Sequence, residues 1–285
     1  MLVNLNEMLR KAQQDHYAVG LFNAVNVEMA RAVLETAEEM RAPVIVGTAE
    51  ILLPAMGLER VAEYLLPMAD KASVPVCVHY DHGLSFASCM QALRLGFTSI
   101  MYDCSTDRYE DNVAKVARMT EICHAMGVTV EGELGHVGNN TPPGQDGGRT
   151  DDPSAFYTDP ALAEDYGKRT GVDALAIAVG NAHGDYPFPP KLDFQRIAEI
   201  AGRTAVPLVL HGGSGLSEND FRTAIGSGIC KVNIFTELDK AGKAGVEEGL
   251  AKGARTMMEL IPYEIAAMKA VVRDKISLFG SAGRA

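Results

Sequence analysis

The sequence predicts an α/β protein, a (β/α)8 TIM barrel with a C-terminal helical extension, and three observations support this fold. Eight short apolar or β-branched runs recur along the 285 residues, alternating with longer segments of helical spacing. Their near-continuous apolar character is typical of strands covered on both faces of a parallel sheet. No GxGxxG motif follows the first run, which disfavours an open dinucleotide-binding sheet. A single barrel of about 250 residues accommodates all of these units.

The expected elements follow from these runs in chain order. The strands are expected at residues 17–22, 43–47, 75–80, 98–102, 128–133, 174–179, 206–210 and 229–234. Helical spacing predicts helices at 29–41, 58–71, 86–95, 112–126, 160–170, 194–203 and 218–226. The tail after residue 237 lacks a further strand and predicts two helices, 238–249 and 263–277. Residues 135–160 are expected to form one long irregular loop, and a loop of that length is usually functional or else disordered.

The composition restricts the partners and the compartment. The chain carries 37 acidic and 26 basic side chains, a net charge of -11, without a basic cluster. Nucleic acid and anionic membranes are therefore poor partners, although a local site can still bind a small anion. Five cysteines without a CxxC pair indicate reduced thiols, and no segment is typical of a signal peptide or a membrane span. We expect one cytoplasmic domain spanning residues 1–285.

Side chains capable of chemistry gather where the expected strands end. His82, His183 and His211 follow three different strands, and barrel enzymes build their sites from these loops. Three imidazoles there predict a Zn²⁺ site with one coordination position left for a substrate oxygen or water. Asp81 adjoins His82 and is a candidate general acid/base. The alternative is that each histidine only caps its strand. His79, on the strand face of Asp81, is either an outer partner of the site or a core residue.

Glycines and hydroxyl side chains follow the last three expected strands, in GNAHG (180–184), HGGSG (211–215) and NIFTE (233–237). Glycine lets backbone N–H groups approach an anion closely, and Ser214 and Thr236 add hydroxyl groups. Barrels often bind phosphate after strands 7 and 8. The sequence therefore predicts a phosphate site that shares two loops with the candidate metal ligands.

A metal beside a phosphate site suits a phosphorylated ketose, because the metal can polarise the carbonyl and stabilise an enediolate. Lys231 lies inside the last expected strand without a recognised imine motif, so a Schiff-base mechanism is not indicated. These features favour reversible carbon–carbon bond cleavage. A metal-dependent sugar-phosphate isomerase or epimerase would use the same intermediate and remains an alternative, as does a non-catalytic subunit with the same fold.

Five ordered motifs resemble those of the class II, zinc-dependent ketose-bisphosphate aldolases, above all the tagatose-bisphosphate aldolase-like branch. They are VHYDHG (78–83), VEGELGHVG (130–138), GVDALAIAVGNAHG (171–184), VPLVLHGGSG (206–215) and KVNIFTEL (231–238). The resemblance covers essentially the whole chain and implies a homodimeric or homotetrameric barrel. It also implies cleavage of tagatose 1,6-bisphosphate, fructose 1,6-bisphosphate or a related ketose 1-phosphate into dihydroxyacetone phosphate and an aldehyde. The stereochemistry at C4 and the phosphorylation of the aldehyde stay open.

The same resemblance implies roles for individual residues. His82, His183 and His211 would bind Zn²⁺, and Glu133 would bind when the ion shifts or a second ion is present. Asp81 would exchange a proton with the C4 hydroxyl. The substrate contacts would be Asn233 near the carbonyl, Gly184, Gly212, Ser214 and Thr236 around the phosphate, and Asn23 on the substrate side. Nearby backbone carbonyls would hold a monovalent cation, Na⁺ or K⁺.

The loop after the fifth strand departs from the family pattern. Family members usually carry a glutamate there that transfers a proton at the dihydroxyacetone-phosphate carbon. This chain has no glutamate between Glu133 and Glu164, which leaves Asp146, Asp151 or Asp152 as substitutes.

Two further departures lie near the substrate. Phe235 stands where relatives place an aspartate or a small residue, and GTAEILLPAMG (47–57) lacks the usual serine-rich pattern. We therefore expect an altered aldehyde specificity with unchanged chemistry. Arg255, Arg273 and Arg284 are loose candidates for contacting a second phosphate.

Overall fold

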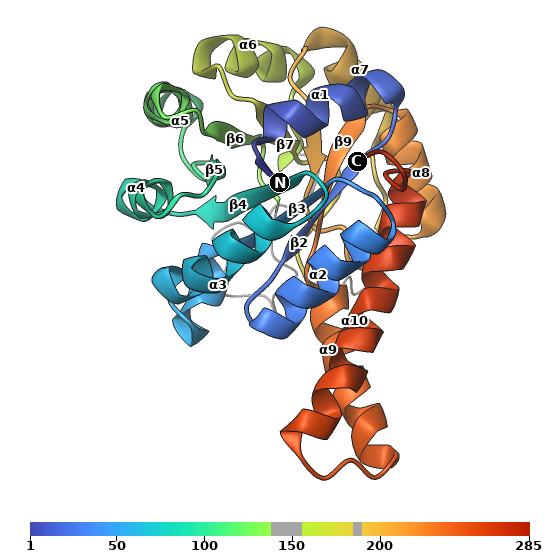
Figure 1. Cartoon of the computed structure of the whole chain (residues 1–285). Helices are drawn as coiled ribbons and strands as arrows, with labels where there is room; N and C mark the ends of the chain where they lie inside the picture. Colours follow the sequence, from blue (N-terminus) through green and yellow to red (C-terminus); the bar gives the residue numbers. More distant parts are fainter. Residues whose placement is uncertain (138–155, 185–189) are drawn as a thin grey trace, which may run out of the picture.

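Eight parallel strands close into a barrel in the computed structural model, which describes residues 1–137, 156–184 and 190–285 (Figure 1). They are β2 (Val19–Asn23), β3 (Val44–Ala49), β4 (Val76–Gly83), β5 (Ser99–Tyr102), β6 (Thr129–Leu134), β7 (Ala174–Ile177), β8 (Leu208–Leu210) and β9 (Ile229–Ile234). Strands adjacent in the chain pair with one another, and β9 pairs with β2 in the register Val19↔Lys231. The predicted barrel and its eight strands are confirmed.

A ring of helices covers the outside of the barrel. They are α2 (Val27–Glu39), α3 (Leu58–Lys71), α4 (Phe86–Leu95), α5 (Tyr109–Ala125), α6 (Pro160–Thr170), α7 (Phe194–Arg203) and α8 (Glu218–Gly226). Local capping fixes where several of them begin: Ser85 caps α4, Asp159 caps α6, and Ser217 forms a capping box with Asp220 at α8. All seven helices were expected, and α3, α4, α6, α7 and α8 have the expected bounds.

A helix that the sequence analysis did not predict closes the amino end of the barrel. It is α1 (Leu5–Asp15), which follows the short strand β1 (Leu2–Val3) and is capped by Asn4. Its buried face, Leu5, Met8, Leu9 and Ala12, packs against the apolar inward-facing residues Val19, Leu21, Ile45, Cys77, Ala174, Ala176, Val209 and Cys230. The amino end of the barrel interior is therefore an apolar core.

The C-terminal extension is a pair of packed helices, α9 (Thr236–Ala251) and α10 (Met257–Phe279), that projects well beyond the barrel (Figure 1). A Cβ on Gly245 would lie 2.4 Å from the carbonyl oxygen of Tyr263, so glycine permits this close packing. The predicted extension is confirmed. Both helices begin earlier than expected, and for α10 the reason is the Thr256 side chain, which caps the amide of Glu259.

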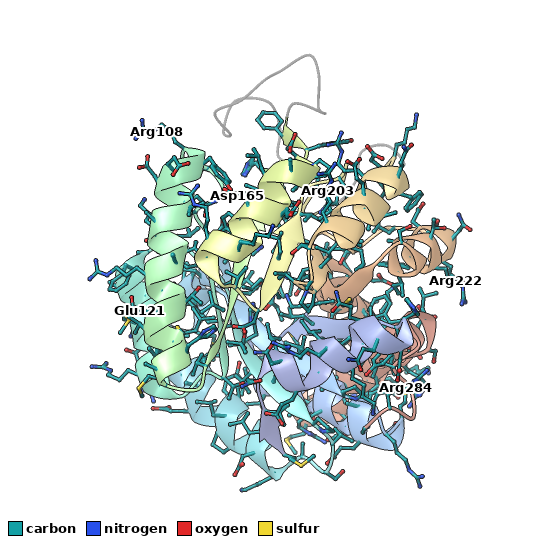
Figure 2. The ribbon with its side chains drawn as sticks, turned by 90° about the horizontal axis from the view of Figure 1, so that it is seen from above. Arg108, Glu121, Asp165, Arg203, Arg222 and Arg284 are labelled. Atoms are coloured by element: carbon teal, nitrogen blue, oxygen red, sulfur yellow. The ribbon has the colours of Figure 1, made fainter. Side chains whose placement is uncertain are left out.

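The charged side chains lie mainly on the outer helices. In the view turned by 90°, Arg108, Glu121 and Arg222 lie along the outer edge of the molecule (Figure 2). In the described part of the chain, no helix combines the length and the apolar character that crossing a bilayer requires. Of the expected irregular loop, residues 138–155 lie outside the described residues, and Asp146, Asp151 and Asp152 lie among them.

Candidate active site

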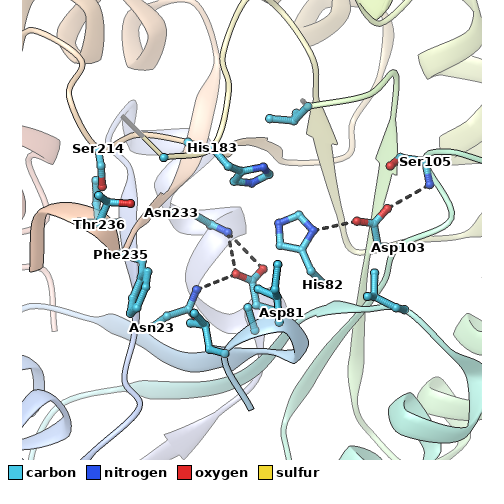
Figure 3. A pocket seen from close by; sticks show the side chains of 18 of the residues that line it. Asn23, Asp81, His82, Asp103, Ser105, His183, Ser214, Asn233, Phe235 and Thr236 are labelled. Atoms are coloured by element: carbon cyan, nitrogen blue, oxygen red, sulfur yellow. Dashed lines mark hydrogen bonds and ion pairs between the residues drawn. The ribbon is translucent and has the colours of Figure 1, made fainter. Parts of the chain in front are cut away.

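A pocket of about 370 Å³ opens at the carboxyl ends of the strands, where the sequence places the candidate residues. It is lined by nine of them: Asn23, Asp81, His82, His183, Gly184, Gly212, Ser214, Asn233 and Thr236 (Figure 3). His211 and Glu133 are almost fully buried and do not line it, but His211 packs against His82 with ring centroids 4.7 Å apart. The structure therefore brings together residues from β2, β4, β6, β9 and the loops after β7 and β8.

Three imidazole nitrogens converge at the base of this pocket. One ring nitrogen each of His82, His183 and His211 lies within 4.8 Å of the others. His82 Nε2, His183 Nε2 and His211 Nδ1 are buried and have no hydrogen-bond partner among the described residues. Because buried polar groups normally have a hydrogen-bond partner, three nitrogens without one that face one another are suited to share one ligand. The residues present thus fit a metal ion with a preference for imidazole, such as Zn²⁺.

Carboxylates hold the opposite nitrogens of two of these rings. Asp103 Oδ2 lies 2.8 Å from His82 Nδ1, and Glu131 Oε1 lies 2.9 Å from His211 Nε2. This pattern of outer carboxylates fixes the tautomer and the orientation of metal-binding histidines in many proteins. His82 also adopts a left-handed backbone conformation (φ 46°) at a register shift of β4, a strained geometry that is concentrated at functional sites.

Glu133 lies beside the three histidines. Its Oε2 is 3.2 Å from His211 Nδ1 and has no hydrogen-bond partner in the described part of the chain, while its Oε1 accepts a hydrogen bond from the Val137 amide. It also forms a group with His82 and Asp103 whose potential ligand atoms lie within 4.8 Å of one another. Glu133 is therefore placed to bind a shifted or a second ion.

Asp81 is held between two amides at the floor of the pocket. Asn23 Nδ2 donates to its Oδ2 at 2.8 Å, and Asn233 Nδ2 donates to its Oδ1 at 3.2 Å (Figure 3). Burial opposes ionisation, but the positive potential of His82 and Lys231 outweighs it and lowers the pKa of Asp81. Asp81 is therefore an oriented carboxylate that can accept a proton.

The histidines of the site differ in their preferred charge. Burial lowers the pKa of His183 to about 3, so that ring is neutral, as a metal ligand must be. Burial also disfavours the charged form of His211, but the neighbouring carboxylates of Glu131 and Glu133 outweigh it and raise the pKa to about 10. Metal binding at His211 therefore requires the release of a proton.

The predicted phosphate residues surround one end of the pocket. Gly212 has φ 63°, and a Cβ there would lie 2.0 Å from the Ala182 carbonyl oxygen, so only glycine lets the loops after β7 and β8 touch. Thr236 is the first residue of α9, and the Ser214 hydroxyl accepts a hydrogen bond from the Glu237 amide. Backbone amides, hydroxyls and a helix amino terminus here favour an anion.

The pocket also has apolar lining residues. Ile51 and Leu52 from the unpredicted 3-10 helix η1 (Glu50–Ala55) line it together with Leu84. Glu50 joins these segments, because its Oε2 accepts hydrogen bonds from the Leu84 amide and the Ser88 hydroxyl. The described lining residues include neither lysine nor arginine.

The three arginines considered for a second phosphate lie elsewhere. Arg273 pairs with Glu39 at 2.7 Å and Arg284 with Asp15 at 3.1 Å, while Arg255 lies between α9 and α10. None of the three lines the pocket.

The sequence analysis assigned no role to two charged residues that the structure shows to be buried. Glu131 on β6 and Lys231 on β9 are fully buried and lie 2.8 Å apart. The signal for them was a charged residue inside an otherwise apolar strand, but the sequence did not show that they pair.

Comparisons with known proteins agree with this geometry. The family model described as "Fructose-bisphosphate aldolase class-II" matches residues 3–284. Proteins named fructose-bisphosphate aldolase are 40% identical in Geobacillus stearothermophilus (100% of this chain, 99% of the relative) and 39% identical in Thermus caldophilus (100% of both). The crystal structure of the YdjI aldolase from Escherichia coli K12 superposes with a TM-score of 0.89 at 36% identity over 100% of both chains. The chain therefore belongs to the class II fructose-bisphosphate aldolase family, a family of lyases.

Proposed function

We propose that this chain is a zinc-dependent aldolase that reversibly cleaves a ketose 1-phosphate or 1,6-bisphosphate into dihydroxyacetone phosphate and an aldehyde. Aldol cleavage of ketose bisphosphates is the activity that the family match and the aldolase relatives support, and zinc dependence is general in class II. The observation that carries the proposal is the convergence of three buried imidazole nitrogens, without a hydrogen-bond partner in the described part of the chain, beside the oriented carboxylate of Asp81.

We assign the zinc to His82 Nε2, His183 Nε2 and His211 Nδ1, with Glu133 as an additional ligand. When bound, the ion acts as a Lewis acid that polarises the ketose carbonyl. Asp103 and Glu131 keep two of the rings oriented toward it. Three histidine ligands would leave a coordination position for a substrate oxygen, as in catalytic zinc sites.

We assign Asp81 as the general base that removes the proton of the C4 hydroxyl. Deprotonation of that hydroxyl starts the cleavage of the C3–C4 bond, and Asp81 returns the proton in the reverse direction. Asn23 and Asn233 hold its two oxygens, so the carboxylate needs no reorganisation to react.

We place the phosphate of dihydroxyacetone phosphate at Gly184, Gly212, Ser214 and Thr236, with Asn233 near its carbonyl, Asn23 on the substrate side, and a Na⁺ or K⁺ ion bound to nearby backbone carbonyls. We place the aldehyde half against the apolar lining residues Ile51, Leu52 and Leu84.

A retro-aldol screen tests the function. Fructose, tagatose and other ketose 1-phosphates and 1,6-bisphosphates are incubated with the zinc-loaded protein, and triose phosphate is detected with a coupling enzyme. We expect triose phosphate release that EDTA abolishes. Borohydride treatment in the presence of substrate should leave no covalent adduct on the protein. Ketose interconversion without triose phosphate would instead indicate an isomerase or epimerase. Bound zinc without turnover would indicate a non-catalytic subunit.

We further propose that residues 1–285 form one domain, which the family match over residues 3–284 supports. We propose a homodimer or homotetramer, because Leu250, Met257 and Met258 are exposed on the projecting α9–α10 pair. Light scattering during size-exclusion chromatography measures the assembly. The five free, buried cysteines agree with a reducing, cytoplasmic location.

A further inference from the structure

Lys231 is a fully buried cation in the barrel interior, next to the proposed active site on the side of the amino ends of the strands. Its Nζ donates to Glu131 Oε1 at 3.1 Å, lies 2.8 Å from Glu131 Oε2, and donates to Asn233 Oδ1 at 2.8 Å. The ammonium group thus contacts a carboxylate on β6 and an amide on its own strand, β9.

The contact with Asn233 fixes the direction of its amide. An asparagine side chain has an accepting oxygen and a donating nitrogen at its two ends. Lys231 occupies the oxygen, so the nitrogen faces Asp81, to which it donates. Asn233 is therefore held at both ends, and the end that faces the pocket is a donor.

The contact with Glu131 reaches the histidine cluster. Glu131 Oε1 accepts from Lys231 and also lies 2.9 Å from His211 Nε2. When His211 Nε2 carries the proton of this hydrogen bond, Nδ1 is the nitrogen left to bind a metal. A buried carboxylate needs a paired cation to stay ionised in this role, and Lys231 supplies it.

We propose that Lys231 is a positioning residue of this enzyme. It keeps Asn233 directed at Asp81 and, through Glu131, keeps His211 directed at the metal, so one buried cation aligns the substrate side and the metal side of the site. The expected effect on exchange kinetics rests on the proposed function. The expected effect on zinc affinity depends only on the histidine cluster.

The test compares four variants with the wild-type chain. Lys231→Met removes the ammonium at similar length, and Glu131→Gln removes the carboxylate. The double variant Lys231→Met/Glu131→Gln removes both charges, so it leaves no unpaired buried charge and guards against misfolding of the single variants. Lys269→Met is the matched control, because Lys269 pairs with Glu35 and Glu39 on the outer helices.

Three quantities are measured for each variant: zinc affinity by competition with a chromophoric chelator, the melting temperature, and kcat and KM for deuterium exchange into dihydroxyacetone phosphate by NMR. We expect Lys231→Met to lower zinc affinity and exchange kcat by roughly 10- to 100-fold each, the usual effect of losing an outer partner. In the double variant, the amide oxygen that the Glu131→Gln substitution introduces can still accept the His211 proton. Zinc affinity and melting temperature should therefore recover, while exchange kcat stays low because Asn233 has lost its partner.

Two results overturn the proposal. The first is a Lys231→Met variant with wild-type zinc affinity and wild-type exchange. The second is a double variant in which exchange recovers together with zinc affinity, since Lys231 would then only neutralise Glu131. If Lys231→Met does not fold, the double variant alone decides between low and recovered exchange. If the wild-type chain exchanges no deuterium, the proposed function fails, and the zinc affinities still test the link from Lys231 to His211.

Discussion

Replacing Asp81 by asparagine keeps the size of the side chain and removes its ability to accept a proton. Asp81 is buried and accepts hydrogen bonds from Asn23 and Asn233. In the variant, one of these donors meets another N–H group, which costs about 1.5–3 kcal/mol for a lost bond to a charged acceptor. The fold should survive this cost, because the three histidines and their outer partners are unchanged.

The effect on catalysis should be larger and confined to one half of the reaction. Positioned general acid/base groups contribute about 10²–10⁴ in rate, or about 2.7–5.4 kcal/mol at 1.36 kcal/mol per decade. Cleavage of a ketose phosphate needs the C4 proton transfer and should slow by this factor. Dihydroxyacetone phosphate has no C4 hydroxyl, so deuterium exchange into it should continue.

The assay measures both rates on one zinc-loaded preparation, with zinc content and melting temperature as controls for folding. Cleavage lost with exchange retained supports the assigned role. A parallel loss of cleavage and exchange at full zinc content would refute it, because Asp81 would then serve the geometry of the whole site.

Three further outcomes are expected. His183→Ala should leave the purified chain without stoichiometric zinc by elemental analysis, and retained zinc would contradict the ligand assignment. The variant should also lose the stabilisation that zinc gives the wild type, which is about 4.1 kcal/mol at a zinc concentration of 1,000 times the Kd. Gly212→Ala forces a side chain into a left-handed conformation 2.0 Å from the Ala182 oxygen, so calorimetry should show destabilisation by more than about 1 kcal/mol and exchange should show a raised KM. The Lys269 hydrogen bond lowers the pKa of Glu39 below its ordinary 4.5, so the stability it adds is present above that pH and is lost as the pH falls through the folded-state value. Lys269→Met should therefore lower the melting temperature slightly at pH 7, and the difference should vanish in acid; a constant difference would exclude this ion pair as the cause.

The barrel and its pocket could be predicted from the sequence because both depend on local patterns. Each strand is an apolar run, and residues that follow parallel strands necessarily meet at one edge, which brings His82, His183 and His211 together. The helix α1 also carries a clear apolar spacing, from Leu5 to Ala12. Its position at the amino end of the barrel depends on the closed barrel and not on its own sequence.

The supporting network could not be predicted in the same way. Glu131 and Lys231 are 100 residues apart, and each alone is a charge in an apolar strand. Their pairing, and the contacts with His211 and Asn233, follow from the register of β6, β8 and β9, which no short pattern encodes. The hydrogen bond from the Leu84 amide to Glu50 is missing from the sequence prediction for the same reason.

The packing of α1 into the amino end of the barrel also affects how the metal enters and leaves. Because apolar side chains fill that end, an ion at the three histidines exchanges with solvent through the carboxyl-end pocket, among the residues that the structure describes. The substrate would occupy the same passage. Metal exchange and turnover would then be coupled: an enzyme saturated with dihydroxyacetone phosphate should lose zinc to a chelator more slowly than the free enzyme.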